Sequence, residues 1–186
     1  YAALGCTHHC AGDVSQLLTI PNMEIMIPGT SQEFHQLLKD SYNNGSPTYF
    51  RLSEYENNET NSVVFGKANC IRKGNEATII CVGNTLQTVI DATENMDVTI
   101  LYYTSVRPFD DELLKDNFNE NIILVEPYYE GALNYQVNKA FKNKKHKIIN
   151  IGVPHKFLVN YGTKSQHDEY LGLDVKGVKK RIEDAI

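Results

Sequence analysis

The stretch Ala77-Thr78-Ile79-Ile80-Cys81-Val82 is a short, continuous apolar run that ends at Gly83-Asn84. Three more apolar runs follow it along the chain, at residues 98–102, 122–125 and 148–151. Continuous apolar runs of this length are typical of strands that are covered on both faces. Segments of helical length separate them, at residues 85–94, 110–116 and 131–142. This alternation predicts a compact α/β sheet over residues 75–186.

The end of this region has its own helix signal. Asp174 is expected to cap a last amphipathic helix. Apolar residues are spaced so that they share one side of that helix, namely Val175, Val178, Ile182 and Ile186.

Residues 1–52 have a different pattern, which predicts helix, strand, helix and strand in that order. A loop over residues 5–13 precedes a helical stretch at 14–18 and a short strand at 23–27. Ser31 is expected to cap the next helix, whose apolar face is Phe34, Leu37 and Leu38. Residues 47–52 read as another strand. We interpret this region as the second part of a doubly wound unit whose first part is not in the sequence.

Residues 53–74 connect the two regions. Their first half, 53–61, is polar and has no periodicity, so it is predicted to be a linker that buries nothing.

Composition and charge exclude several functional classes. The net charge is −5 and the densest positive run, at residues 142–147, is expected to be a solvated helix end rather than a nucleic-acid site. No apolar run approaches the roughly 20 residues of a membrane span, and the first residues do not resemble a signal peptide. The four cysteines have no disulfide-framework spacing, so Cys81 is expected to be a buried free thiol and the compartment a reducing cytoplasm.

Several short stretches, in order along nearly the whole chain, carry a family resemblance. They are Gly5-Cys6-Thr7-His8-His9 with Asp13, Ile20–Met23, Val64–Ala68, Val106–Asp110, Val125–Gly131, Ile151–Pro154, Tyr161–Thr163 and Leu171–Asp174. Together they resemble the C-terminal half of the transketolase and 1-deoxyxylulose-5-phosphate synthase family, which depends on thiamine diphosphate. The resemblance implies the end of a pyrimidine-binding domain at 1–52, a linker at 53–74 and a transketolase C-terminal domain at 75–186.

The resemblance also implies what the chain needs in order to act. The family's magnesium and diphosphate motif belongs to another domain, and the glutamate that activates the cofactor would precede residue 1. We therefore expect thiamine diphosphate and Mg²⁺ in the complete enzyme and neither on this chain alone. The expected partner is an N-terminal, diphosphate-binding half, in a homodimer or a heterotetramer that acts on a sugar. No membrane or nucleic-acid partner is expected.

His8 and His9 are the candidate catalytic residues, because the resemblance places the Thr-His pair above the cofactor, where it contacts substrate oxygens. An imidazole suits this task because it can donate or accept near neutral pH. Arg51 and Asp13 are the candidate substrate-binding residues. The loop could instead be a zinc site, since Cys6, His8, His9 and Cys10 are all zinc ligands. However, residues so close in sequence cannot all face one ion, so no metal site is predicted.

Two positions depart from the family pattern. Leu4 stands where the family usually has an aspartate, and Glu54 stands where it has an arginine that grips the substrate phosphate. A carboxylate repels a phosphate, so the phosphate side of the site is expected to be altered.

The second region has no obvious catalytic set. Glu126, Tyr128, Tyr129 and Glu130 cluster at a strand end and are interpreted as an interface. His155 and His167 are interpreted as surface residues without partners. Gly83-Asn84-Thr85 is similar to a phosphate-binding turn but lacks its further glycines.

Three functional hypotheses stay open at this point. The first is a component of a transferase that moves a two-carbon ketol unit between sugars and is inactive without its N-terminal half. The second is a synthase-like or dehydrogenase E1 β-like component that condenses or decarboxylates pyruvate. The third is a non-catalytic paralogue that acts as an assembly module.

Overall fold

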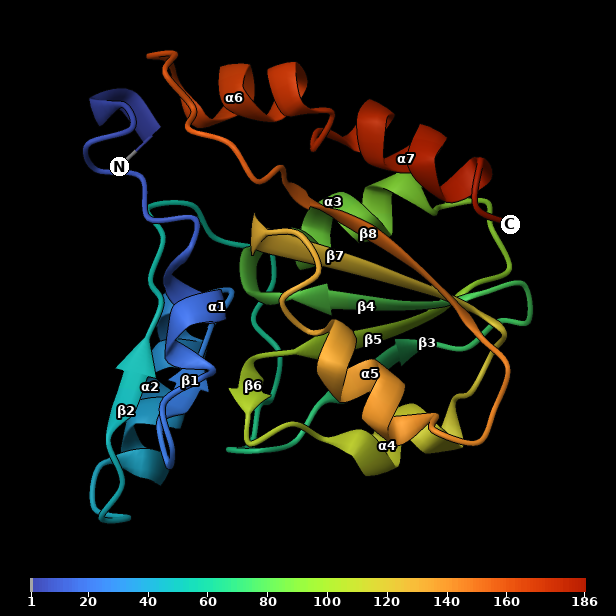
Figure 1. The fold of residues 1–186 in the computed structure, drawn as a ribbon, viewed down its shortest axis with the longest axis horizontal. Coiled ribbons are helices and arrows are strands. Elements are labelled where there is room, and N and C mark those ends of the chain that lie inside the picture. The colour runs from blue at the N-terminus through green and yellow to red at the C-terminus, as the bar shows by residue number, and fades with distance from the viewer. Residues whose placement is uncertain (1) are drawn as a thin grey trace.

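The structure is a computed structural model that describes residues 2–186, and it contains one sheet of five strands and one of three (Figure 1). The larger sheet has the order β3-β5-β4-β7-β8. Its strands are β3 (Asn69–Arg72), β4 (Thr78–Val82), β5 (Thr99–Tyr103), β7 (Asn121–Tyr129) and β8 (Lys147–Val153). Strand β3 is antiparallel to β5, and the other neighbouring pairs are parallel. The α/β fold that the apolar runs predicted is confirmed.

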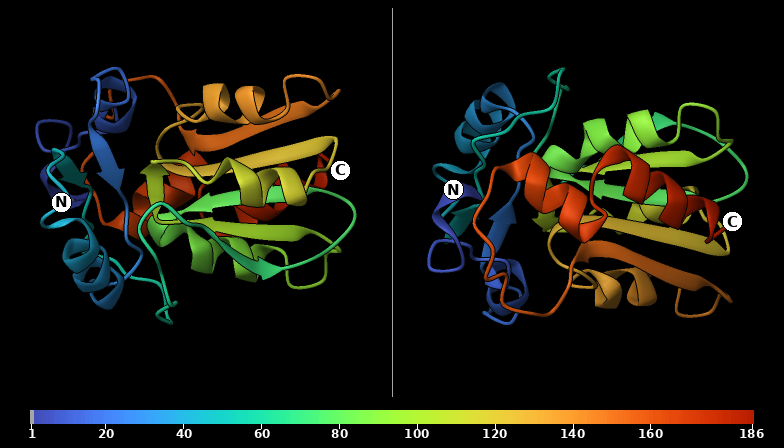
Figure 2. Two further views of the ribbon diagram at one scale, coloured as in Figure 1. Left: turned by 90° about the horizontal axis from the view of Figure 1, so that it is seen from below. Right: turned by 90° about the horizontal axis from the view of Figure 1, so that it is seen from above.

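Helices cover both faces of the larger sheet (Figure 2). Helices α3 (Leu86–Ala92) and α7 (Val175–Glu183) pack on one face, and α4 (Asp111–Asp116) and α5 (Asn134–Ala140) pack on the other. Successive strand residues point to opposite faces, so Ile79 belongs to the core under α3 and Ile80 to the core under α5. Strands β4 and β5 are buried on both faces along their whole length, which is why they read as unbroken apolar runs. Cys81 is a buried free thiol, as predicted.

The smaller sheet contains a strand that comes from the second region of the chain. Its order is β2 (Thr48–Phe50), β1 (Glu24–Met26) and β6 (Ser105–Arg107), with α1 (Asp13–Leu17) and α2 (Ser31–Ser41) beside it. Strand β1 is parallel to β2 and antiparallel to β6. The sequence reasoning identified only a turn after residue 105, so this crossing of the chain into the first unit was not anticipated.

The residues predicted to cap α2 and α7 can be compared with the caps in the structure. Helix α2 is capped by Thr30, whose hydroxyl accepts a hydrogen bond from the Glu33 amide at 3.2 Å, so the assignment of Ser31 was wrong by one residue. Thr30 has extended backbone angles whereas Ser31 is already helical. Asp174 caps α7 as predicted, with its carboxylate 3.0 Å from the Gly177 amide.

The apolar faces of these two helices are narrower than predicted. Leu37 is fully buried on α2, but Leu38 is 37% exposed. On α7 the buried apolar residues are Val178 and Ile182, while Val175 at its start is 40% exposed. Ile186 lies beyond Glu183, the last residue of the helix, and is 46% exposed. A further helix, α6 (Lys164–Leu171), and two short 3₁₀ turns, η1 (Ala2–Leu4) and η2 (Gly83–Thr85), complete the helices among the described residues.

Residues 53–61 of the connector were predicted to bury nothing, and this is wrong for Asn57. Asn57 is 7% exposed and Val63 is 5% exposed, and residues 69–72 form strand β3 of the larger sheet. Polar residues could be buried here because each buried polar group finds a partner. The backbone N–H of Asn57, for example, donates to the Gly29 carbonyl oxygen at 2.9 Å.

A buried carboxylate joins the two units. Glu33 of α2 is 1% exposed, and its Oε2 accepts hydrogen bonds from the Gly29 amide at 2.8 Å and from the Tyr102 hydroxyl of β5 at 2.6 Å. Its Oε1 accepts from the Asn61 amide at 3.0 Å. Asn57 extends this network by donating to the Gly83 carbonyl at 3.1 Å. First unit, connector and second unit therefore share one hydrogen-bond network.

Two glycines allow the units to approach this closely. A Cβ on Gly83 would lie 2.8 Å from the Ile27 carbonyl oxygen, and a Cβ on Gly29 would lie 2.1 Å from the Asn57 Nδ2. Gly83 also has a positive φ of 56°. The glycine of the Gly83-Asn84-Thr85 turn is thus accounted for by backbone contact between the units.

None of the described helices is both long and apolar enough to cross a membrane.

Replacing Tyr102 with Phe is expected to lower the free energy of unfolding by about 1.5–3 kcal/mol, because a hydrogen bond to a charged group is lost. Tyr103→Phe is the matched control, since the neighbouring Tyr103 is equally buried but donates to the Asp110 carbonyl at 2.7 Å. That change should cost only about 1 kcal/mol. Urea unfolding measures both. Equal losses would mean that the Glu33 network contributes no more than an ordinary hydrogen bond.

Candidate functional site

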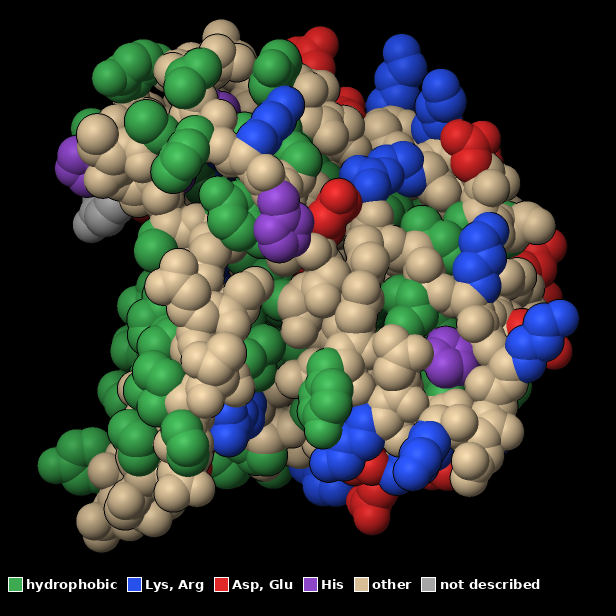
Figure 3. Space-filling view, viewed as in Figure 1, with side chains coloured by type: hydrophobic (Ala, Val, Ile, Leu, Met, Phe, Trp, Pro, Cys, Tyr) green, Lys and Arg blue, Asp and Glu red, His purple; other side chains and the backbone are tan. Residues whose placement is uncertain are grey.

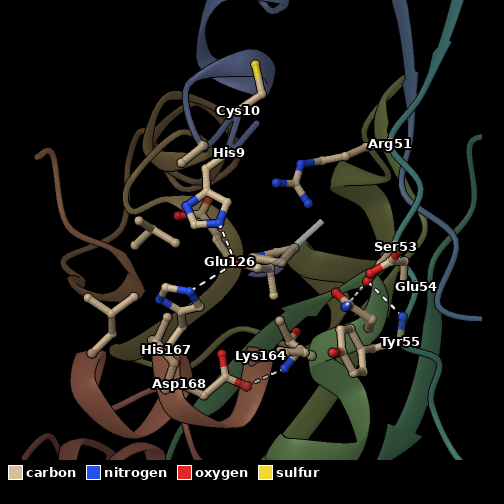
Figure 4. Close-up of a pocket in the computed structure, with 18 of the residues that line it drawn as sticks. His9, Cys10, Arg51, Ser53, Glu54, Tyr55, Glu126, Lys164, His167 and Asp168 are labelled. Atoms are coloured by element: carbon tan, nitrogen blue, oxygen red, sulfur yellow. Dashed lines mark hydrogen bonds and ion pairs between the residues drawn. The ribbon is translucent and has the colours of Figure 1, made fainter. Parts of the chain in front are cut away.

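A pocket of about 330 Å³ lies where the two units and helix α6 meet. The loop before α1, the residues after β2 and the C-terminal ends of strands β4, β7 and β8 form its walls, and α6 closes one side (Figure 4). In α/β sheets ligands bind outside the carboxyl ends of the strands. The pocket has this position in the larger sheet, and it also brings together all four residues that the sequence proposed, His8, His9, Asp13 and Arg51.

Asp13 and Arg51 form an ion pair at the pocket wall. Asp13 begins α1, where its Oδ1 accepts from the Val14 amide at 2.8 Å. Its Oδ2 accepts from the Arg51 Nε at 3.0 Å and from the Tyr49 hydroxyl at 2.8 Å. Burial, with the hydrogen bond to Asp13, raises the pKa of Tyr49 to about 12, so Tyr49 remains a donor. The guanidinium also lies 5.8 Å from the Tyr128 ring centre, so Arg51 is held on two sides.

The two loop histidines differ in their surroundings. His8 is exposed, and its Nδ1 lies 3.0 Å from the Thr7 hydroxyl. His9 is half-buried, and its Nε2 lies 3.0 Å from the Ala2 carbonyl oxygen. A carbonyl oxygen only accepts, so the His9 Nε2 carries the proton. The ring is therefore engaged in holding the loop, which leaves His8 as the less constrained imidazole of the pair.

His167 belongs to the pocket, and the interpretation of it as a surface residue without partners was wrong. It lies on α6, its Nε2 is 3.1 Å from the same Ala2 carbonyl, and its ring meets that of His9 edge-on at 5.1 Å. The only sequence signal for its placement was Thr163 with Gln166, the capping box that starts α6. His155 also has partners, because its Nε2 lies 3.1 Å from the Glu130 carbonyl oxygen and its ring stacks on Tyr129.

Glu126 lines the back of the pocket beyond the last β7 residue that pairs with β4. It is 1% exposed, and its carboxylate accepts from the Gly131 amide at 2.6 Å and from the Leu133 amide at 3.1 Å. Burial outweighs these hydrogen bonds and raises the pKa of Glu126 to about 7. Glu126 thus holds the turn before α5 and changes charge near neutral pH.

Lys164 and Asp168 of α6 face the pocket opposite the Arg51 side (Figure 4). They form an ion pair one helical turn apart, and the Lys164 Nζ lies 5.8 Å from the centre of the Tyr55 ring. Residues 2–186 contain no group of three or more His, Cys, Asp and Glu side chains placed to hold a metal ion.

Comparison with known proteins identifies the family. The profile of the family described as "Transketolase, C-terminal domain" matches residues 66–178. The chain belongs to this transketolase C-terminal domain family. The match begins just before strand β3 and ends within α7.

Proteins of similar sequence are longer than this transketolase-family chain. It is 32% identical over 181 residues to an uncharacterized 33.6 kDa protein in the fasciation locus of Rhodococcoides fascians, covering 95% of the chain and 58% of that relative. It is 31% identical over 190 residues to 1-deoxy-D-xylulose-5-phosphate synthase of Vibrio parahaemolyticus, covering 96% of the chain and 30% of the synthase. The chain thus spans less than two thirds of the length of either relative.

Solved structures show the same fold over nearly the whole chain. A split-gene transketolase, solved as an inactive β4 tetramer, matches with a TM-score of 0.84 at 20% identity over 97% of this chain and 63% of its own. Transketolase from Leishmania mexicana matches with a TM-score of 0.74 at 16% identity, over 97% of this chain and 28% of its own.

Glu126 should make folding stability depend on pH. Its carboxyl pKa is raised from 4.5 in the unfolded chain to about 7 in the fold, so the fold binds the proton more tightly. Its stabilising contribution is full below pH 4.5 and is lost as the pH rises to about 7, an effect of up to about 3 kcal/mol. Glu126→Gln should remove this part of the slope between pH 4.5 and 7 in urea unfolding. An unchanged slope in that variant would assign the titration to other groups.

Proposed function

We propose that this chain supplies the C-terminal part of a transketolase-like enzyme that transfers a two-carbon ketol unit between sugars. The observation that carries the proposal is the pocket, in which the Thr7-His8-His9 loop meets the strand ends of a transketolase C-terminal fold. We further assign residues 1–52 to the pyrimidine-binding domain, 53–74 to the linker and 75–186 to the C-terminal domain. The last part of this linker, residues 69–72, pairs with β5 at the edge of the C-terminal sheet.

The cofactor of the proposed reaction is thiamine diphosphate with Mg²⁺, and the residues of this chain do not fit its metal and diphosphate end. The described residues offer no metal-holding cluster, and Arg51 and Lys164, the Arg and Lys side chains of the pocket, are already paired with carboxylates. We therefore infer that a diphosphate-binding half, on a second chain or on another part of the same polypeptide, holds the cofactor, and that this chain is inactive alone.

Two surfaces support such a partner. Strand β2 pairs with β1 on one side only, so it leaves an open sheet edge within the described chain, and open edges pair readily with other strands. Hydrophobic side chains also lie exposed on the segment before and within α6, and Figure 3 shows hydrophobic side chains gathered in that area at the upper left. They are Phe157, Val159, Tyr161 and Tyr170. A homodimer or heterotetramer in the cytoplasm is the assembly we propose.

His8 is the proposed catalytic residue. It lines the pocket and is exposed. Of its two ring nitrogens, Nδ1 is hydrogen-bonded to the Thr7 hydroxyl, and no partner is found for Nε2 among the described residues. The Nε2 is therefore available to donate to, or accept from, an oxygen of a sugar in the pocket. His9 has the supporting role of holding the loop through Ala2.

A second candidate function is 1-deoxyxylulose-5-phosphate synthesis from pyruvate. It is favoured by the relatives of that name, which match this chain over 96% of its length at 30–31% identity. The two functions differ in the donor, which is a ketose in the first and pyruvate in the second.

The proposal is tested by adding a diphosphate-binding transketolase half, thiamine diphosphate and Mg²⁺ to the chain and measuring ketol transfer and pyruvate consumption separately. Turnover should require both halves. His8→Ala should lower kcat/KM about 100-fold, as expected for the loss of a proton-transferring side chain.

His35→Ala is the matched control, because His35 is an exposed histidine of α2 that does not line the pocket. Its kinetics should equal those of the unmodified chain. Full activity of His8→Ala would contradict the assigned role, pyruvate consumption would favour the second function, and no turnover at all would leave assembly as the chain's function.

A further inference from the structure

The turn between α2 and β2 contains Asn44 followed by Gly45, and this is the only Asn-Gly pair in the sequence (Figure 1). Both residues are exposed. Gly45 has a positive φ of 80°, and a Cβ at its position would meet no atom within 4 Å. Its backbone N–H has no hydrogen-bond acceptor among residues 2–186. The main-chain nitrogen that follows Asn44 is therefore neither crowded nor engaged.

The side chain of Asn44 is held by hydrogen bonds at both ends of its amide group. Its Oδ1 accepts from the Ser46 N–H at 3.0 Å, which forms an Asx turn that folds the side chain back along the main chain. Its Nδ2 donates to Oε1 and Oε2 of Glu24, at 2.9 Å each. The turn thus keeps the side-chain carbonyl close to the backbone of Gly45, and the Ser46 N–H polarises that carbonyl.

This arrangement favours one intramolecular reaction, in which water is the only co-reactant. The Gly45 nitrogen loses its proton to water or hydroxide and forms a bond to Cγ of Asn44, while the Ser46 N–H stabilises the charge that develops on Oδ1. The Cγ–Nδ2 bond then breaks, and Nδ2 leaves as ammonia with a proton taken from water. Water opens the resulting succinimide at either carbonyl. In total, asparagine and water become ammonia and aspartate or isoaspartate.

The product would disturb the point where β1 and β2 begin. Glu24 starts β1 and lies opposite Thr48, the first residue of β2. Its carboxylate accepts from the Thr48 hydroxyl at 2.7 Å, and its N–H donates to the Pro47 carbonyl at 2.8 Å. A carboxylate in place of the Asn44 amide would remove the donor to Glu24 and set two like charges against each other, which is destabilising between neighbouring strands.

We propose that Asn44 is a site of spontaneous deamidation, and that the carboxylate formed there repels Glu24 and weakens the pairing of β1 with β2. The inference goes beyond the proposed function and does not depend on it. Arg51 follows β2 directly, so the modification acts on the strand that carries one wall of the pocket.

The reaction is tested by incubating the whole chain at mildly alkaline pH and mapping its peptides by mass spectrometry. Asn44 should be converted to aspartate and isoaspartate, faster as the pH rises, because the attacking nitrogen has to lose its proton. Asn143 is the matched internal control, since it also lies in an exposed turn but is followed by Lys144. The side chain of that lysine crowds the nitrogen, so Asn143 should react about tenfold more slowly, which corresponds to about 1.4 kcal/mol on the barrier.

The consequence is tested with Asn44→Asp, which imitates the product, in urea unfolding. This change should raise the equilibrium constant for unfolding about two- to fivefold. In the background of Glu24→Gln it should have no such effect, and the two changes together form a double-mutant cycle. Asn143→Asp adds the same charge in the other exposed turn and should not lower stability. The inference is overturned if Asn44 keeps its amide as long as Asn143 does, or if Asn44→Asp costs as much with Glu24→Gln as without it.

Discussion

The buried carboxylate of Glu33 is the interaction that fixes the two units of this molecule relative to each other. It receives hydrogen bonds from the backbone of its own unit, from the connector and from Tyr102 of the larger sheet. A carboxylate away from water is costly unless each oxygen is satisfied, so the three donors must be present together. The network therefore resists sliding of one sheet against the other, which a purely apolar contact would permit.

The pocket depends on that alignment because its residues come from both sides of the junction. Arg51 follows β2 of the small sheet, whereas Glu126 comes directly after the residues of β7 that pair with β4 in the large one. The close contact of Gly83 with Ile27 sets how near these two ends lie. Helix α6 is then attached through His167 and Ala2 to the loop that carries His8. The walls of the pocket are thus joined to one another by short and specific contacts.

Sequence reasoning predicted the parts of this fold that are governed by local pattern. The buried strands of the larger sheet were visible as apolar runs, and Asp174 was visible as a helix cap. Strand β6 has three residues, too few to show a period, and it is defined by pairing with β1. Thr30 and Ser31 are both good caps, and only backbone angles separate them. The candidate residues Asp13 and Arg51 were identified from resemblance, but their pairing and the presence of His167 beside them depend on contacts between distant segments.

The pairing of β6 with β1 also sets the order in which the molecule can form. The second edge of β1 (residues 24–26) is covered only by β6 (residues 105–107). Strands β3, β4 and β5 of the larger sheet lie between these two strands in the sequence. During synthesis the early segment therefore leaves the ribosome with an uncovered edge, the kind of surface that invites wrong pairing. The pairing of β1 with β6 is a contact of high sequence separation, and forming such contacts requires closing a long loop of chain. The three-stranded arrangement β2-β1-β6 can therefore form only after residues 105–107 have been synthesised.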